Sequence, residues 1–271
     1  MTNDTPSSGE LLHNLVQIVW FAIRRLNSRQ DLPYISLMLT APLLHLLRFR
    51  GELKTPVGKL RIEGNDVLRW SIYGLFKTRF SYMKMLESTP FKNRSCSTII
   101  DVGANLGDFA IAISRKARRI ISIEPGRENF LTLCSNLNAN RLNQVIPLNI
   151  AAHDSTEKLS MMGNGADLAV SSFNGGQHVV GRPLDAVLRT CEIEYVDILK
   201  IDVQGHEMKV LQGLTNSLKD HRVGLAIVEV HTHRNIQTND VVSFMQPLGY
   251  HLVATDFLFG RPQLYFEFAD N

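Results

Sequence analysis

The feature that most constrains this chain is a strand that runs directly into a glycine turn and a helix. Residues 98–102 are suited to a buried strand, Gly103 and Gly107 follow it, and residues 109–113 begin an apolar helix. Glycine lets the backbone turn sharply and lets a ligand approach the main chain, while the free N–H groups of a first helical turn attract an anionic group. The turn therefore predicts a nucleotide or cofactor site. A pyrophosphate-binding dinucleotide loop would require glycine where Asn105 stands.

Apolar runs and helical periodicity alternate through the rest of the chain. Further strands are expected at 119–124, 144–151, 196–203 and 224–231, helices at 127–140, 183–188, 205–214 and 239–248, and two final strands at 250–254 and 263–268. Residues 154–181 lack a clear period and are expected to form strands or loops inserted before the next unit. The pattern predicts a doubly wound, mostly parallel α/β sheet with an antiparallel hairpin at its C-terminal edge.

Residues 1–95 are expected to form an N-terminal extension that caps a main domain at 96–271. The apolar run at 15–23 is too short to cross a bilayer of roughly 30 Å, so a helix at 11–26 would pack on the domain or a second subunit, or lie in a membrane interface. A second apolar patch, at 37–47, is expected to be broken by Pro42. We regard residues 11–50 as a candidate peripheral membrane contact.

Residues 55–62 and 63–66 read as short strands joined by a turn. No residue of the extension shows catalytic spacing.

Composition excludes several classes of protein. A length of 271 residues suits one catalytic-sized domain with a smaller appendage, and a net charge of +3 gives no reason to expect nucleic acid as a partner. The three widely spaced cysteines form no zinc or redox motif and indicate a reducing compartment. Because the first residues lack the pattern of a signal peptide, we expect a cytoplasmic protein.

Four expected strands end in or near acidic residues. Ligands of doubly wound sheets bind beyond the carboxyl ends of the strands, which is where Asp101, Glu124, Asp202 and the pair Glu229/His231 fall. A carboxylate in the position of Glu124 can accept both hydroxyls of a ribose. A glycine turn without a pyrophosphate loop suits an adenosyl ligand that carries an amino acid, such as S-adenosylmethionine.

Several motifs together resemble the FkbM family of S-adenosylmethionine-dependent methyltransferases. They are 101–107 (DVGANLG), 124–125 (EP), 137–140 (LNAN), 151–154 (AAHD), 198–207 (ILKIDVQGHE), 210–213 (VLQG) and 228–231 (VEVH). The resemblance implies a Rossmann-like domain that methylates a hydroxyl of a sugar, polyketide or other small metabolite, including glycan or lipid-linked acceptors. By position it implies cofactor contacts at Asp101, Gly103, Asn105, Gly107 and Glu124, with the adenine near Asn149, Ala152 and Asp154. One departure is Gln204, where the family commonly has Glu.

Methyl transfer to oxygen needs an acceptor hydroxyl held in line and a base for its proton. If the strand at 196–203 lies beside the opening strand, Asp202 falls near the sulfonium end of the cofactor. The candidate catalytic residues are Asp202, His206, Glu229 and His231, and histidine has the best-placed pKa for a base. Glu207 could also be a base, but it fits equally as an ordinary anion in a first helical turn.

Three alternatives stay open at this point. Asp202, Glu229, His231 and His233 could hold a divalent metal, although we expect no metal because such residues more often hydrogen-bond a polar substrate. The same sheet could serve a nicotinamide-dependent oxidoreductase, against which Asn105 argues. A non-catalytic binding module could associate with membranes through residues 11–50.

Overall fold

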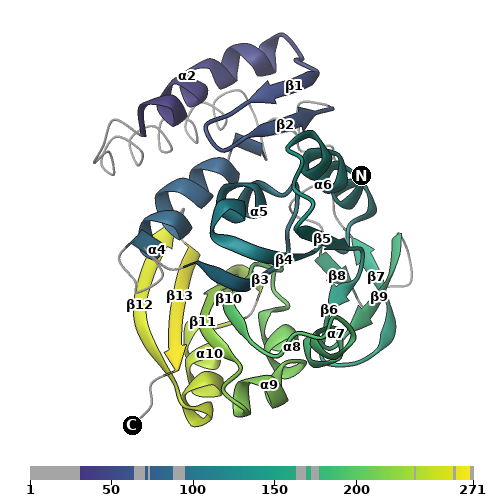
Figure 1. Ribbon diagram of the computed structural model, residues 1–271, viewed down its shortest axis with the longest axis vertical. Coiled ribbons are helices and arrows are strands. Elements are labelled where there is room, and N and C mark those ends of the chain that lie inside the picture. Colours follow the sequence, from purple (N-terminus) through teal and green to yellow (C-terminus); the bar gives the residue numbers. More distant parts are fainter. Residues whose placement is uncertain are drawn as a thin grey trace.

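The computed structural model describes residues 31–63, 71–72, 74–87, 95–162, 169–171, 177–234, 236–258 and 261–268. Its centre is a seven-stranded sheet in the order β12-β13-β11-β10-β3-β4-β5 (Figure 1). The strands of this sheet are β3 (Cys96–Val102), β4 (Ala117–Ile123), β5 (Val145–Leu148), β10 (Val196–Ile201), β11 (Val223–Glu229), β12 (Tyr250–Leu258) and β13 (Arg261–Phe268). The α-helices are α2 (Leu32–Leu46), α4 (Lys84–Glu87), α5 (Asp108–Ile113), α6 (Arg127–Ala139), α7 (Leu184–Thr190), α8 (Glu207–Gln212), α9 (Thr215–Lys219) and α10 (Thr238–Met245).

The strand order confirms the predicted doubly wound fold. Strands β5, β4, β3, β10 and β11 pair in parallel, and β13 is antiparallel to both β11 and β12. The opening strand β3 lies directly beside β10, as expected from the sequence. The chain continues from β3 to β4 on one side and crosses later to β10 on the other, so the carboxyl end of β3 is the switch point at which ligands bind in such sheets.

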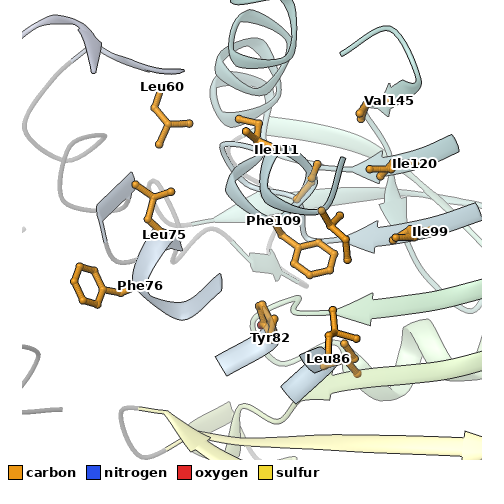
Figure 2. Close-up of a cluster of buried hydrophobic side chains, with 14 of the residues drawn as sticks. Leu60, Leu75, Phe76, Tyr82, Leu86, Ile99, Phe109, Ile111, Ile120 and Val145 are labelled. Carbon is orange, nitrogen blue, oxygen red and sulfur yellow. The ribbon is translucent and has the colours of Figure 1, made fainter. Parts of the chain in front are cut away.

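Two apolar layers cover the sheet because alternate residues of each buried strand point to opposite faces. On one face, Ile99 and Ile120 pack with α5, α6 and the helical residues of the extension. On the other, Ile100 and Ile121 pack with α7, α8, α9 and α10. Figure 2 shows part of the first layer, in which Tyr82 of the extension meets the ring of Phe109 edge-on, with 5.5 Å between ring centroids.

The inserted stretch forms a second sheet, in the order β6-β9-β7-β8. Its strands are β6 (Ala151–Ala152), β7 (Glu157–Met162), β8 (Ala169–Ser171) and β9 (Gln177–Arg182). The expected single strand at 144–151 is therefore wrong in extent, because β5 ends at Leu148 and Ala151 already belongs to the second sheet. Between them, the side-chain amide of Asn149 donates to the carbonyl oxygens of Glu124 and Pro125, which ties the chain to the end of β4.

Two expectations for the extension are corrected. Helix α2 continues through Pro42 instead of breaking there. Proline removes one helical hydrogen bond. We attribute the continuity to buried Tyr34, Leu37 and Ala41 before Pro42 and partly buried Leu44 after it, which hold both halves of the helix on the core.

The turn of the hairpin is also placed differently. β1 (Gly51–Lys54) and β2 (Lys59–Ile62) flank residues 55–58, where Thr55 Oγ1 donates to the carbonyl of Gly58 over 2.7 Å. The strand expected at 55–62 therefore begins only at Lys59, and residues 64–66 lie outside the described residues. The expected helix at 11–26 lies outside the described residues.

Residues 74–87 bring the extension into contact with the sheet. Helical residues 74–77 lead into the π-helix η2 (Thr78–Met83) and then into α4. Phe76, Phe80 and Leu86 are buried in the same core as β3 (Figure 2). Among the helices of the described part, none combines the length and the apolar character that a membrane crossing requires.

Candidate active site

The glycine turn after β3 has the backbone geometry that its sequence predicts. Gly103, Asn105 and Gly107 all have positive φ, at 76°, 48° and 89°. A Cβ at Gly103 would come within 1.8 Å of the carbonyl oxygen of Asp202, so the turn after β3 and the turn after β10 touch backbone to backbone. Only glycine permits that approach, which brings the ends of the two strands together.

Glu124 directly follows β4 and lies next to this turn. Its Oε2 accepts from the amide of Asn105 over 2.8 Å, and its Oε1 accepts from the amide of Gly126 over 2.9 Å. Burial raises the pKa of Glu124 to about 7, against the opposing effect of these hydrogen bonds. The carboxylate is thus fixed at the switch point by the same loop that was predicted to hold the cofactor.

The residues predicted near an adenine lie in two places. Asn149 contacts the end of β4, as described above, and Ala152 is buried in β6. Asp154 belongs to a separate, partly exposed cluster, in which its Oδ2 lies 2.5 Å from Lys209 Nζ and its Oδ1 lies 2.8 Å from His153 Nδ1. Lys209 holds the pKa of Asp154 below its usual range.

A buried lysine pairs with Asp101. Lys200 faces Asp101 in the register of β10 and β3, and its Nζ lies 2.8 Å from Asp101 Oδ1 and 3.1 Å from the carbonyl oxygen of Gly103. Burial alone would lower the pKa of Lys200, but the carboxylates of Asp101 and Asp202 raise it above its ordinary value. Lys200 therefore stays cationic beneath the glycine turn.

A second buried lysine comes from the extension. Lys77, immediately before η2, places its Nζ 2.7 Å from Asp202 Oδ2 and also against Glu229 Oε2. Tyr82 donates its hydroxyl to the same oxygen of Glu229 over 3.2 Å. Burial alone would raise the pKa of Asp202, yet Lys77 and Lys200 hold it well below its usual range. Asp202 is accordingly a fixed anion, not a base that works near neutral pH.

His231 lies at the centre of this rim of strand ends. Its Nδ1 is 2.6 Å from Glu207 Oε1, while its Nε2 is 3.7 Å from Asp202 Oδ1 and 3.6 Å from Glu229 Oε1. The guanidinium of Arg261, which can only donate, lies 3.4 Å from Nε2. We therefore assign the proton to Nδ1, where it is donated to Glu207, and leave Nε2 with a lone pair.

His206 is placed apart from the other candidates. It precedes α8, and within the described part of the chain it forms no hydrogen bond or ion pair with Asp202, Glu229 or His231. Burial lowers the pKa of its imidazole. The structure thus brings three of the four candidate catalytic residues together and leaves His206 outside the group.

Sequence reasoning missed two contributors, Lys200 and Lys77, and left the role of Glu207 open. Lys200 could have been found, because a lysine in an otherwise apolar central strand needs a buried partner. Glu207 was read as an alternative base or a first-turn anion, whereas it is fully buried and contacts His231. Lys77 gave a weaker signal, because it is one of two cations, with Arg79, in the largely apolar helical segment that ends with η2.

The residues considered above as ligands of a divalent metal form a cluster that also contains a lysine ammonium group. Asp202, Glu229 and His231 each offer one ligand atom, and these atoms lie within 4.8 Å of one another. The ammonium of Lys77 already contacts two of the three residues. A divalent ion would have to displace this ammonium group, so the arrangement favours Lys77 over a metal ion as the cation that these residues bind. The side chain of His233 lies outside the described ones.

Several acceptor oxygens on the rim have no donor. Within the described part of the chain, Asp101 Oδ2, Asp202 Oδ1, Gln204 Oε1 and Glu229 Oε1 are buried without a hydrogen-bond partner. Such groups cost free energy unless a ligand or water satisfies them. Four acceptors in need of donors fit a ligand that carries an ammonium group and hydroxyls.

Both a family model and a curated relative that match this chain are methyltransferases. The model of the FkbM methyltransferase domain matches residues 101–252. The hexuronic acid methyltransferase AglP of Haloferax volcanii is 29% identical over 174 residues, which are 60% of this chain and 70% of that protein.

Two solved structures were also compared. The methyltransferase FkbM of Methylobacillus flagellatus is 17% identical with a TM-score of 0.49, over 85% of this chain and 60% of that one. The fibrillarin of Aeropyrum pernix with bound S-adenosyl-L-methionine is 12% identical with a TM-score of 0.45, over 68% and 73%. This chain thus spans less than two thirds of the length of the M. flagellatus protein.

Proposed function

The chain belongs to the FkbM methyltransferase family, and we propose that it transfers a methyl group from S-adenosylmethionine to a hydroxyl of a sugar. The observation that carries the proposal is the pairing of Glu207 with His231 beside Asp202, at the strand ends where the cofactor loop lies. The relative named for hexuronic acid makes a uronic acid the first acceptor to test.

The residues present fit the proposed cofactor. Glu124, held at the glycine turn, would accept the ribose hydroxyls, and the unsatisfied oxygens of Asp101 and Asp202 would accept from an ammonium group. The backbone amides of the first turn of α5 would face a carboxylate. When bound, S-adenosylmethionine supplies an electrophilic methyl group on a positively charged sulfur.

His231 has the geometry of a general base. Glu207 accepts the Nδ1 proton and so fixes both the tautomer and the ring, while Nε2 faces the rim. With the cofactor bound, Nε2 would take the hydroxyl proton as the acceptor oxygen bonds to the methyl carbon and the carbon–sulfur bond breaks with its electron pair left on sulfur. Glu207 then stabilises the resulting imidazolium.

The charges of the rim are consistent with this assignment. With His231 neutral, four carboxylates face three cations, namely Asp101, Asp202, Glu207 and Glu229 against Lys77, Lys200 and Arg261. The rim thus carries one net negative charge, which suits a cofactor with one net positive charge. After transfer the cofactor would have lost that charge and His231 would have gained a proton, so the summed charge of these residues and the cofactor would be unchanged.

The test is a screen for transfer of isotope-labelled methyl groups to saccharides, with and without uronic acids. His231→Asn keeps a side-chain amide to donate to Glu207 but removes Nε2. We expect it to lower the rate by about 10²-fold or more with unchanged cofactor affinity. His251→Asn, at an exposed position, is the matched control. Equal rates for wild type and His231→Asn would overturn the proposed base, and transfer to no hydroxyl acceptor would overturn the proposed reaction.

A further inference from the structure

Helix α2 carries a stripe of exposed leucines. Leu32, Leu39 and Leu43 are 57%, 63% and 56% exposed. Leu46 at the helix end and Leu47 beyond it reach 77% and 67%. Their spacing places them on one face of the helix.

The opposite face of α2 is buried. It carries Tyr34, Leu37 and Ala41, which pack into the protein core. A helix that is apolar on both faces is normally enclosed, so the leucine stripe is a surface that needs a cover.

Unmatched positive charge follows the stripe directly. Arg48, Arg50 and Lys54 are exposed and form no ion pair within the described part of the chain. From residue 32 to residue 51 the sequence contains no acidic residue. The hairpin of β1 and β2, which carries Lys54, lies beside α2 (Figure 1). The surface therefore combines an apolar stripe with a basic end.

We propose that α2 docks on an anionic lipid surface, with the leucines in the acyl boundary and Arg48, Arg50 and Lys54 at the head groups. The size of the surface argues against a second copy as the cover. A helix of 15 residues is about 22 Å long and about 10–12 Å across, so the footprint of one face is on the order of 200–300 Å², a small contact beside the roughly 800 Å² per partner of a stable interface. Uncompensated cations would also repel one another across a symmetric contact.

The docking surface is joined to the catalytic rim through η2. Arg79 of η2 pairs with Asp31 over 2.8 Å, and the ring of Phe80 meets Tyr34 of α2 edge-on at 6.0 Å between centroids. Lys77, the residue before η2, contacts Asp202 and Glu229 as described above. Docking of α2 would therefore hold the catalytic rim at a fixed distance and orientation from the lipid surface. This arrangement suits an acceptor that is presented at the lipid surface. The docking itself does not depend on the proposed reaction.

The experiment is co-sedimentation of the full chain with vesicles of phosphatidylcholine, alone or mixed with anionic phosphatidylglycerol. We expect binding to the mixed vesicles that weakens as salt is added. The variant Leu39→Ser/Leu43→Ser/Leu46→Ser should lose more than about tenfold in partitioning. The matched control, Leu131→Ser/Val180→Ser/Val253→Ser, changes three exposed apolar residues elsewhere and should bind as wild type does. Thermal unfolding of each variant verifies that it is folded.

Three results would overturn the proposal. The first is the absence of vesicle binding by the wild type. The second is a concentration-dependent dimer in light scattering that only the leucine variant abolishes, which would make α2 an interface between copies. The third is equal binding to both vesicle types, or binding that the variant Arg48→Gln/Arg50→Gln/Lys54→Gln leaves unchanged. Either outcome would show that these cations are not part of the docking surface.

Discussion

Lys77 Nζ lies 2.7 Å from Asp202 Oδ2, although 125 residues separate them in the sequence. The pair joins the N-terminal extension to the turn after β10, the strand that lies beside the cofactor loop. Because Lys77 also contacts Glu229, one side chain of the extension bridges two carboxylates of the rim. The extension is thus part of the candidate active site as well as a cover for the sheet.

Replacing Lys77 by Met should destabilise the fold by about 3–5 kcal/mol, because it removes the nearest cation from two buried carboxylates and leaves them only the more distant Lys200 and Arg261. The free energy of unfolding in urea measures this loss. Lys219→Met, at an exposed position on α9, should change stability by less than about 0.5 kcal/mol. Adding Glu229→Gln to Lys77→Met should restore part of the loss, and a double variant no better than the single one would show that charge is not the cause.

Replacing Glu207 by Gln should slow methyl transfer by about 10²-fold, because the amide can donate to Nδ1 of His231 and so favour the wrong tautomer. Cofactor affinity should change little. The acid limb of the pH–rate profile, on which the base is lost by protonation, separates this role from a structural one, because it should shift in the variant. An unchanged profile with an unchanged rate would contradict the assigned pair.

The raised pKa of Glu124 predicts a pH-dependent stability. Its folded pKa is about 7 against 4.5 for the ordinary group, so the folded state binds the proton more tightly than the unfolded state. The associated stability is present below pH 4.5 and is lost as the pH rises through 7, by about 3 kcal/mol in total. Urea unfolding from pH 4.5 to 8 should show this loss in wild type and in the exposed control Glu128→Gln. In Glu124→Gln this fall in the free energy of unfolding should be absent. If the fall persists in that variant, it arises from another titrating group.

Gly103→Ala should destabilise the protein by more than about 3 kcal/mol, because the new Cβ would meet the carbonyl oxygen of Asp202 at 1.8 Å. Gly51→Ala is the control, because it introduces the backbone strain of a positive φ without the clash. Gly51 also has a positive φ, of 136°, but its Cβ would meet only Phe49 at 3.7 Å. We expect the Gly51 variant to lose about 1 kcal/mol, and similar losses for the two variants would contradict the close approach of the two turns.

The sequence predicted the parts of the site that depend on strand ends. Parallel buried strands are recognisable from their apolar residues, and their carboxyl ends meet at one edge, so Asp101, Asp202 and Glu229 could be placed together without a structure. The resemblance to the FkbM family, carried by motifs within the same units, is confirmed by the match over residues 101–252.

The contacts that the sequence did not reveal arise from tertiary packing. Nothing in the local pattern around Lys77 tells which of its neighbours in space are acidic, and the partner of Glu207 follows a different strand, 24 residues later. The helical path through Pro42 likewise depends on burial on the core, which outweighs a local preference. His206 was included because it belongs to the same motif as Asp202, but adjacency in sequence did not bring it into the group.

The most direct test of the account is a calorimetric titration of the purified chain with S-adenosylmethionine. Wild type and Glu128→Ala should bind alike, with a dissociation constant in the micromolar range, and Glu124→Ala should bind about 100-fold more weakly because two charge-assisted hydrogen bonds to the ribose are lost. Absence of binding by wild type at hundreds of micromolar, or equal affinities for wild type and Glu124→Ala, would contradict the placement of this cofactor at the glycine turn.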